Sequence, residues 1–248
     1  MSKLIAITGK GGVGKTTVSA LMIKQMISAG MKPVLAIDAD PNSCLDAALG
    51  VQITDTVGRA REETRASADN AVNISKKELL RLKIEQGLIE SNGFDLIAMG
   101  RPEGAGCYCY ANNVLKDVIA EISSQYPYVV MDNEAGLENL SRRVVQKAHL
   151  MVLVSDASNA GLVTLLRLYE LASEMDIRYD KLALVINKTR NNNIEPDNDI
   201  IKKIKADLVI NVPSDEALAS YAEENKPLLT LPDDNAAYNK LGELIKII

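Results

Sequence analysis

The stretch GKGGVGKTT, which begins at Gly9, constrains the fold more than any other part of the chain. Residues Gly9–Thr16 fit the pattern G-x-x-x-x-G-K-[ST], in which glycines let the backbone wrap closely around phosphate groups. The apolar run Lys3–Thr8 before it predicts a buried strand, and Lys15–Ala29 after it carries apolar residues at helical spacing. This order of strand, loop and helix is the context that a phosphate-binding loop requires. The sequence therefore predicts that backbone N–H groups and a helix N-terminus bind the phosphates of a nucleotide.

The residues of this loop have separate expected roles. Lys15 is expected to reach the β- and γ-phosphates and to take part in catalysis, and the Thr16 hydroxyl is expected to hold Mg²⁺. The other residues of the loop that we expect to contact the nucleotide are Gly11, Gly12, Val13, Gly14 and Thr17.

Apolar runs alternate with helical patterns along the rest of the chain, which is typical of a parallel sheet covered by helices on both faces. We expect an α/β fold of the P-loop NTPase class, with a mostly parallel central sheet of about seven strands. We predict a single domain, residues 1–248, in which the more polar segment 54–91 is a peripheral helical insertion. After Lys3–Thr8, the predicted strands are Pro33–Asp40, Phe94–Gly100, Tyr128–Asn133, Leu150–Asp156, Lys181–Lys188 and Ala206–Val212.

Acidic residues stand at the ends of two of these strands. Asp38 and Asp40 lie in IDADPNS, and Asp132 lies in VVMDNEAG. Ligands of open α/β sheets bind outside the carboxyl ends of the strands, where carboxylates can hold Mg²⁺ and orient a water molecule. A single aspartate at such a position also serves as a helix cap or turn residue. Three of them downstream of a phosphate loop favour a catalytic site.

The composition argues against several classes of protein. The formal net charge is −5, whereas nucleic-acid binding needs clustered Lys and Arg. No apolar run approaches the roughly 20 residues of a membrane span, and the N-terminal segment does not have the pattern of a signal peptide. We therefore expect a cytoplasmic protein that binds neither nucleic acid nor membrane. A single histidine, His149, excludes a histidine-rich metal store.

Two of the three cysteines, Cys107 and Cys109, are separated by one residue in GCYCY. Thiolates suit soft metal ions, but a closed site needs about four ligands and one C-x-C supplies two. Two copies across a two-fold axis would supply four. The spacing alone also fits two structural cysteines. Cys44 is expected to be a packed small side chain, and the roles of Tyr108 and Tyr110 stay open between a dimer interface and half-buried aromatics.

The loop KGGVGKTT resembles the deviant Walker A motif of the dimeric ATPases that include MinD, ParA, ArsA and the nitrogenase iron protein. The resemblance implies a homodimer that binds ATP or ADP, in which Lys10 of one subunit reaches the nucleotide of the other as an arginine finger does. It implies that Asp40 positions the attacking water, with Asp38 near the metal and Asp132 supporting Mg²⁺. It further implies that Asn187 and Lys188 bind adenine beside the loop VPSDEAL, which begins at Val212 and contains Pro213.

The segments MGRPEGAGCYCYANN and VVMDNEAGLENLSRR together resemble the CooC/AcsF family of nickel-insertion ATPases. The resemblance extends over essentially the whole chain. It implies a dimer that binds one Ni²⁺, with Zn²⁺ as a possible competitor, through Cys107 and Cys109 of each subunit. The implied partner is apo carbon monoxide dehydrogenase or acetyl-CoA synthase. The alternative is a MinD- or ParA-like spatial organiser without metal cargo, but the C-terminal segment NKLGELIKII favours a last helix docked on the sheet over a basic membrane helix.

Overall fold

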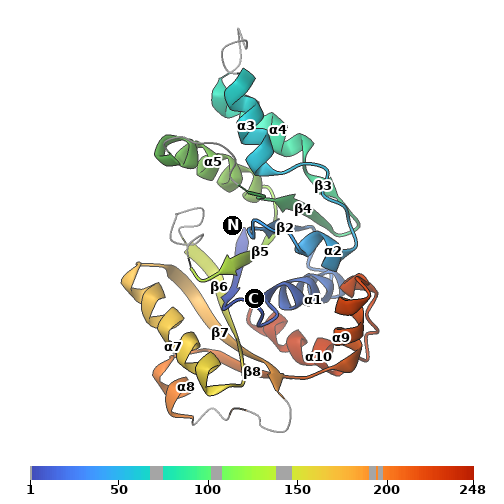
Figure 1. The fold of residues 1–248 in the computed structure, drawn as a ribbon, viewed down its shortest axis with the longest axis vertical. Coiled ribbons are helices and arrows are strands. Elements are labelled where there is room, and N and C mark those ends of the chain that lie inside the picture. Colours follow the sequence, from blue (N-terminus) through green and yellow to red (C-terminus); the bar gives the residue numbers. More distant parts are fainter. Residues whose placement is uncertain (1, 68–74, 102–107, 138–146, 190–193, 195–197) are drawn as a thin grey trace.

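Figure 1 shows the computed structural model of the chain, which describes residues 2–67, 75–101, 108–137, 147–189, 194 and 198–248. The strands of these residues are β1 (Lys3–Gly9), β2 (Val34–Asp38), β3 (Ile89–Glu90), β4 (Phe94–Ala98), β5 (Tyr128–Ala135), β6 (Lys147–Asp156), β7 (Arg178–Thr189) and β8 (Leu208–Pro213). They join one eight-stranded sheet in the order β3-β4-β2-β5-β1-β6-β7-β8. Neighbouring strands are parallel except β3 and β4. The predicted α/β fold with a mostly parallel sheet is confirmed.

The strand that the sequence pattern missed is β3, which lies inside the segment 54–91 and has only two residues, Ile89 and Glu90. It pairs antiparallel with β4 at the edge of the sheet. Two residues are too few to show either a continuous apolar run or an alternation. Strands β6 and β7 also begin three residues before their predicted starts, because most of their first residues are polar and hide the apolar pattern.

One face of the sheet is covered by α1 (Lys15–Ser28), α2 (Leu45–Leu49) and α10 (Ala236–Leu241), with α9 (Glu216–Glu223) beyond them (Figure 1). The helix α1 supplies the centre of this layer, since its apolar residues Leu21, Met22 and Met26 are fully buried against the strands. Burial of aliphatic side chains contributes roughly 1.5–3 kcal/mol each. This layer therefore holds the helix that follows the phosphate loop firmly on the sheet.

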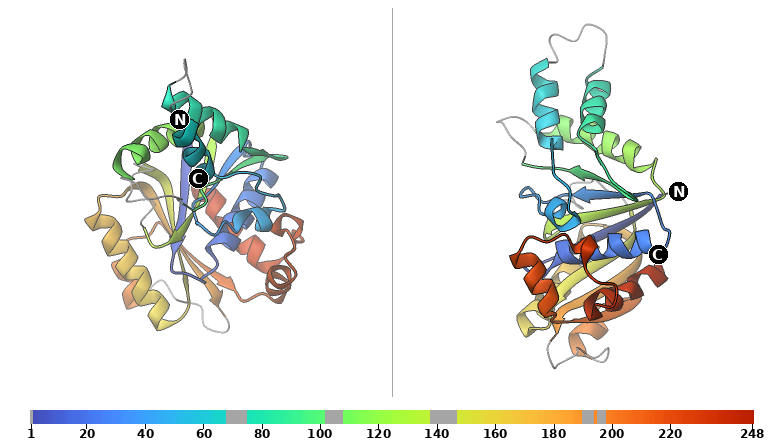
Figure 2. Two further views of the ribbon diagram at one scale, coloured as in Figure 1. Left: turned by 45° about the horizontal axis from the view of Figure 1, so that its top comes forward. Right: turned by 90° about the vertical axis from the view of Figure 1, so that its right-hand side faces the viewer.

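The opposite face carries two separate apolar clusters. Helices α7 (Asn159–Glu174) and α8 (Asp199–Lys203) pack on β6 and β7. Helices α3 (Val57–Ser67), α4 (Lys76–Gln86) and α5 (Tyr108–Ser123) pack on β2, β4 and β5. Figure 2 shows α3 and α4 projecting side by side beyond the sheet. These two helices lie within the segment 54–91, which the sequence assigned to a peripheral helical insertion.

The C-terminal residues lie against the fold near its N-terminus, and Figure 2 shows the two ends on the same side. The turn of 3-10 helix η2 (Gly242–Ile247) buries Leu244 fully and packs on α1 and α10. The ammonium groups of Lys3 and Lys181 donate hydrogen bonds to the carbonyl oxygens of Ile248 and Ile247, at 2.7 and 2.9 Å. The segment is docked as expected, but its last residues form a 3-10 helix against α1 and α10, where the sequence pattern predicted a helix docked on the sheet. In the part of the chain that the structure describes, no helix has the length and apolarity needed to cross a membrane.

Candidate functional site

The loop between β1 and α1 lies at the carboxyl edge of the sheet, next to the ends of β5 and β6. Gly12 and Gly14 have positive φ angles of 79° and 94°, which favour glycine. A Cβ atom on Gly14 would lie 2.5 Å from the amide nitrogen Nδ2 of Asn187. Gly14 is also the N-cap of α1, with no side-chain cap and no acidic residue in the first turn. The N–H groups of that turn are therefore free of a side-chain cap, and an anion at the helix N-terminus would satisfy them.

The loop contains two lysines in different environments. Lys15 is buried to 8% exposure, and its Nζ donates a 3.3 Å hydrogen bond to the carbonyl oxygen of Lys10 across the loop. This ammonium group sits beside the helix N-terminus, where phosphate oxygens would offer stronger acceptors. Lys10 itself is exposed and lies near the carboxylate of Asp156. The pKa of Asp156 is lowered mainly by hydrogen bonds from Ser158, with Lys10 and Lys188 adding to the effect.

Asp38 and Asp132 are paired in register on the neighbouring strands β2 and β5, and both are buried. Asp38 accepts hydrogen bonds from the N–H groups of Asp40 and Leu45, at 3.0 and 2.9 Å. Burial raises the pKa of Asp38 to about 6, against the lowering effect of these bonds. Burial likewise raises the pKa of Asp132 to about 7, and the nearby charge of Asp38 adds to this.

The donor set around Asp132 fits Mg²⁺. The hydroxyl of Ser19 donates a 3.0 Å hydrogen bond to Asp132 Oδ1, and the Thr16 hydroxyl also bonds to this carboxylate. Hydroxyl and carboxylate oxygens are the hard ligands that Mg²⁺ prefers, together with phosphate oxygens and water. Two buried carboxylates on adjacent strands also leave negative charge that a divalent cation would neutralise. Residues Thr16, Asp38 and Asp132 thus lie close together at this edge of the sheet, and their expected role in holding Mg²⁺ stays a prediction.

The end of β5 is fastened to the end of β1. The Thr8 hydroxyl donates to the carbonyl oxygen of Gly136, and the N–H of Gly136 donates to the carbonyl oxygen of Gly9 at 3.2 Å. The side chain of Asn133 donates to the carbonyl oxygen of Ile7 at 3.0 Å. The start of the phosphate loop and the residues that follow Asp132 therefore form one hydrogen-bonded unit.

Asn187 and Lys188 contact the loop from β7. Asn187 Nδ2 donates a 2.8 Å hydrogen bond to the carbonyl oxygen of Val13, and Lys188 Nζ donates a 3.0 Å bond to that of Gly12. Their expected role in binding adenine is a different contact and stays a prediction, while the observed contacts hold the loop in its shape. Pro213 ends β8 and pairs with Thr189 of β7. The predicted base loop therefore starts on the strand next to the one that carries Asn187 and Lys188.

Asp40 follows β2 in a tight turn, where its Oδ1 accepts a 2.8 Å hydrogen bond from the N–H of Asn42. The same turn leads to Cys44, which is the N-cap of α2. The expectation that Cys44 is a packed small side chain is wrong, because the residue is exposed at the start of this short helix. Partial desolvation of its thiol, followed by the nearby charges of Asp38 and Asp40, raises the pKa of Cys44.

The predicted cargo ligands fall in a part of the chain that the structure describes only partly. Cys107 lies outside the described residues, and Cys109 belongs to the first turn of α5 by its backbone alone. Among the described side chains, no three His, Cys, Asp or Glu residues form a group that could hold a metal ion.

Sequence reasoning missed three residues of the site. Thr8 ties the loop to Gly136, Ser19 reaches Asp132, and Asp156 lies near Lys10. Ser19 stands three residues after Thr16, on the same face of α1, so helical spacing could have indicated it. Asp156 ends a predicted strand and carries the same signal as Asp38.

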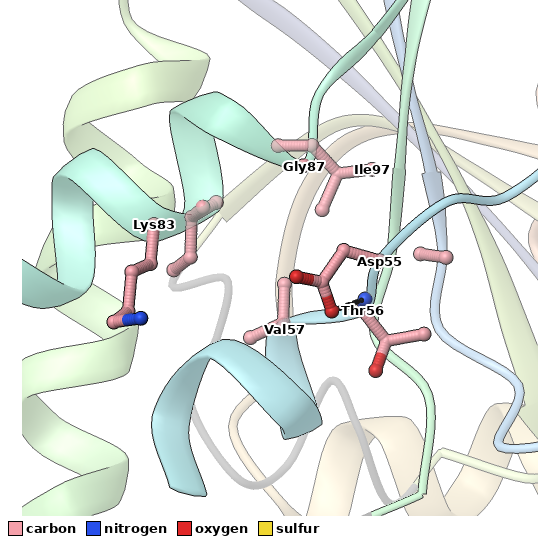
Figure 3. Close-up of a pocket in the computed structure, with 8 residues that line it drawn as sticks. Asp55, Thr56, Val57, Lys83, Gly87 and Ile97 are labelled. Carbon is pink, nitrogen blue, oxygen red and sulfur yellow. Dashed lines mark hydrogen bonds between the residues drawn. The ribbon is translucent and has the colours of Figure 1, made fainter. Parts of the chain in front are cut away.

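A separate small pocket lies at the base of helices α3 and α4, lined by residues that include Thr56, Lys83, Gly87 and Ile97 (Figure 3). Its volume of about 10 Å³ is close to the room for the centre of one water molecule. This pocket is too small for a nucleotide.

Three comparisons place the chain among known proteins. The family model of the CobQ/CobB/MinD/ParA nucleotide binding domain matches residues 4–228. An uncharacterised ATP-binding protein of Methanocaldococcus jannaschii is 39% identical over 99% of this chain and 98% of its own length. The carbon monoxide dehydrogenase accessory protein CooC of Rhodospirillum rubrum is 31% identical over 70% of each chain.

The fold has counterparts among solved structures. The septum site-determining protein MinD of Pyrococcus horikoshii, solved in complex with Mg-ADP, superposes with a TM-score of 0.67 at 19% identity. The match covers 98% of this chain and 94% of that one. At this identity the likeness shows a shared fold.

Proposed function

Since the chain belongs to the CobQ/CobB/MinD/ParA family of nucleotide-binding ATPases, we propose that it is a dimeric Mg²⁺-dependent ATPase that carries nickel. In this proposal the ion is bound between two subunits and inserted into carbon monoxide dehydrogenase or acetyl-CoA synthase. The observation that carries the proposal is the pair Cys107 and Cys109 in a chain 31% identical to a carbon monoxide dehydrogenase accessory protein.

Hydrolysis is assigned to the residues at the carboxyl edge of the sheet. The N-terminus of α1 and Lys15 bind the phosphates, and Thr16, Asp38 and Asp132 hold Mg²⁺ directly or through water. A bound magnesium ion would neutralise part of the negative charge on the phosphates. Asp40 accepts a hydrogen bond from the attacking water and orients it toward the γ-phosphate. Lys10 of the second subunit stabilises the charge of the transferred phosphoryl group, so that turnover depends on dimerisation.

Nickel is the cargo in this proposal. Two C-x-C segments across a two-fold axis offer four thiolates, which is the number needed for a closed tetrahedral or square-planar site. Because the nucleotide and the thiolates would share one interface, a change of the dimer on hydrolysis would also change the metal site. Zn²⁺ binds the same ligands and is the natural competitor.

A second candidate is a spatial organiser like MinD, whose solved structures share this fold. Cycling on a membrane needs an amphipathic helix that is free to leave the protein. Here the segment from Gly242 to Ile247 is packed on α1 and α10, with Leu244 fully buried. That packing argues against this segment as a membrane helix that is free to leave the protein.

The test is an anaerobic Ni²⁺ titration of the reduced protein, with and without ATP, while the number of chains per particle is measured. We expect one ion per two chains in the wild type and none in the double variant Cys107→Ala/Cys109→Ala. Nucleotide affinity should be the same in both proteins. Cys44→Ala is the matched control, because it removes the exposed third thiol and should leave the stoichiometry unchanged. Nickel binding that survives the double substitution would refute the cargo site.

A further inference from the structure

Two segments from different parts of the chain meet beside the candidate magnesium site. The turn after β2 carries Asp40, and the exit of β4 carries Met99 and Arg101. The carbonyl oxygen of Asp38 accepts a 2.8 Å hydrogen bond from the N–H of Met99, and the N–H of Ala39 donates to the carbonyl oxygen of Asp132 at 2.9 Å. The ends of β4, β2 and β5 are thereby joined by a row of backbone hydrogen bonds.

A second row of contacts runs through side chains. Arg101 Nη2 donates a 2.9 Å hydrogen bond to Asn42 Oδ1. The N–H of Asn42 in turn donates to Asp40 Oδ1, and the N–H of Asp40 donates to Asp38 Oδ1 at 3.0 Å. Arg101 is thus linked through one residue to the carboxylate that we assign to the attacking water.

The start of α3 packs closely against the backbone of Met99 and Arg101 on the other side. The N–H of Gly58 donates a 2.9 Å hydrogen bond to the carbonyl oxygen of Met99, and a Cβ on Gly58 would lie 2.3 Å from the carbonyl oxygen of Arg101. Gly100 has a φ of 63°, and a Cβ there would lie 2.6 Å from the Cβ of Thr56. Thr56 is also part of the pocket wall in Figure 3, so this junction lies directly beside that pocket. Such close backbone approach restricts the backbone at Gly100 and Arg101, from which the Arg101 side chain reaches Asn42.

We propose that Arg101 is a positioning residue for hydrolysis, which acts through Asn42 on the turn that presents Asp40. The inference rests on the proposed role of Asp40 as the residue that orients water. An arginine suits this task because its charged N–H donors have a fixed planar geometry, so that one bond sets both distance and direction. The turn needs such support, since Pro41 contributes no N–H and Ser43 has a positive φ of 45°.

The experiment is steady-state ATP hydrolysis by the full chain carrying Arg101→Ala, Asn42→Ala, the double substitution or Arg101→Lys. We expect Arg101→Ala to lower kcat about three- to ten-fold, which is the net scale of one ordinary hydrogen bond, because this bond is exposed to solvent. The KM for ATP should not change, because Arg101 contacts the turn and not the phosphate loop. Arg101→Lys should recover part of the rate, since lysine can also donate to Asn42. The control is Arg178→Ala, which removes an arginine paired with Asp176 at the start of β7 and should leave kcat as in the wild type.

The double-mutant cycle decides between mechanisms. If Arg101 acts through Asn42, the double variant should be no slower than the slower single variant. Additive losses would show that Arg101 acts on the nucleotide or a second subunit directly and would overturn the inference, as would a wild-type kcat in Arg101→Ala. Asp40→Ala is measured in parallel. If it keeps full turnover, the assigned role of Asp40 is wrong; if it loses turnover while Arg101→Ala does not, only the positioning role is wrong.

Discussion

The buried carboxylate of Asp132 makes a strong prediction about stability. Asp132 is 1% exposed, and burial raises its pKa from 3.8 to about 7. At about 1.4 kcal/mol for each tenfold change in proton affinity, this difference corresponds to about 4 kcal/mol. The folded protein without Mg²⁺ and nucleotide therefore bears a cost of that order when Asp132 is ionised. Replacement by asparagine removes the charge and keeps an oxygen that can accept from Ser19.

Proton linkage decides in which direction the stability of the protein changes with pH. The pKa of Asp132 is raised in the folded state, so its contribution to stability is complete below about pH 4 and is lost as the pH rises through about 7. Between pH 5 and pH 8 this carboxyl alone should lower the free energy of unfolding of the wild type by about 3 kcal/mol. Asp132→Asn should lack this loss. Part of the stability gained by Asp132→Asn would come from Asp38, because its negative charge would no longer be repelled by that of Asp132.

The assay is urea unfolding of nucleotide-free protein in EDTA at pH 5 and pH 8. We expect the stability of Asp132→Asn relative to wild type to rise by about 3 kcal/mol between the two pH values. Asp176→Asn is the control, because Asp176 has an 81% exposed side chain and should show no such change. Adding Mg-ADP should stabilise the wild type more than Asp132→Asn, since the variant lacks a carboxylate for the ion. An equal pH dependence of wild type and Asp132→Asn would refute the claim that Asp132 is buried with its charge uncompensated.

Two further changes test the loop. Lys10→Ala should leave ADP affinity and melting temperature unchanged, because Lys10 is exposed. It should lower the rate of ATP turnover by about two orders of magnitude or more. Turnover at the wild-type rate would contradict the action of Lys10 on the nucleotide of the second subunit. Gly14→Ala should weaken ADP binding at least ten-fold by calorimetry, because its Cβ would meet Asn187 at 2.5 Å. Gly12→Ala, where a Cβ meets nothing within 4 Å, isolates the cost of positive φ alone, and equal losses in the two variants would show that the contact with Asn187 does not matter.

Much of the fold could be predicted from local pattern. The central strands β1, β2 and β5 are continuous apolar runs, because they are buried on both faces and need no polar side. The two-residue strand β3 and the polar beginnings of β6 and β7 escaped prediction, since pairing with a neighbouring strand, and not their own composition, makes them strands. Cys44 was misplaced for a related reason, because its exposure depends on how α2 starts after the turn.

Some features of the candidate site could likewise be predicted from the sequence, and others depend on the tertiary structure. The loop from Gly9 to Thr16 and the acids Asp38, Asp40 and Asp132 are evident from the sequence by itself, because phosphate binding requires glycines, a lysine and strand-end carboxylates at set positions along one chain. Only the tertiary structure decided which of them meet. The strand order puts β2 between β4 and β5, and this brings Asp38 opposite Asp132 and the exit of β4 against the turn of Asp40.

The contacts of Asn187 with Val13 and of Arg101 with Asn42 join residues 174 and 59 positions apart. No local pattern specifies such pairs, because their free energy comes from burial and hydrogen bonding between segments that only the folded sheet holds together. The sequence therefore determined which chemistry the chain can carry at its phosphate loop. The packing of the strands determined which side chains support that loop.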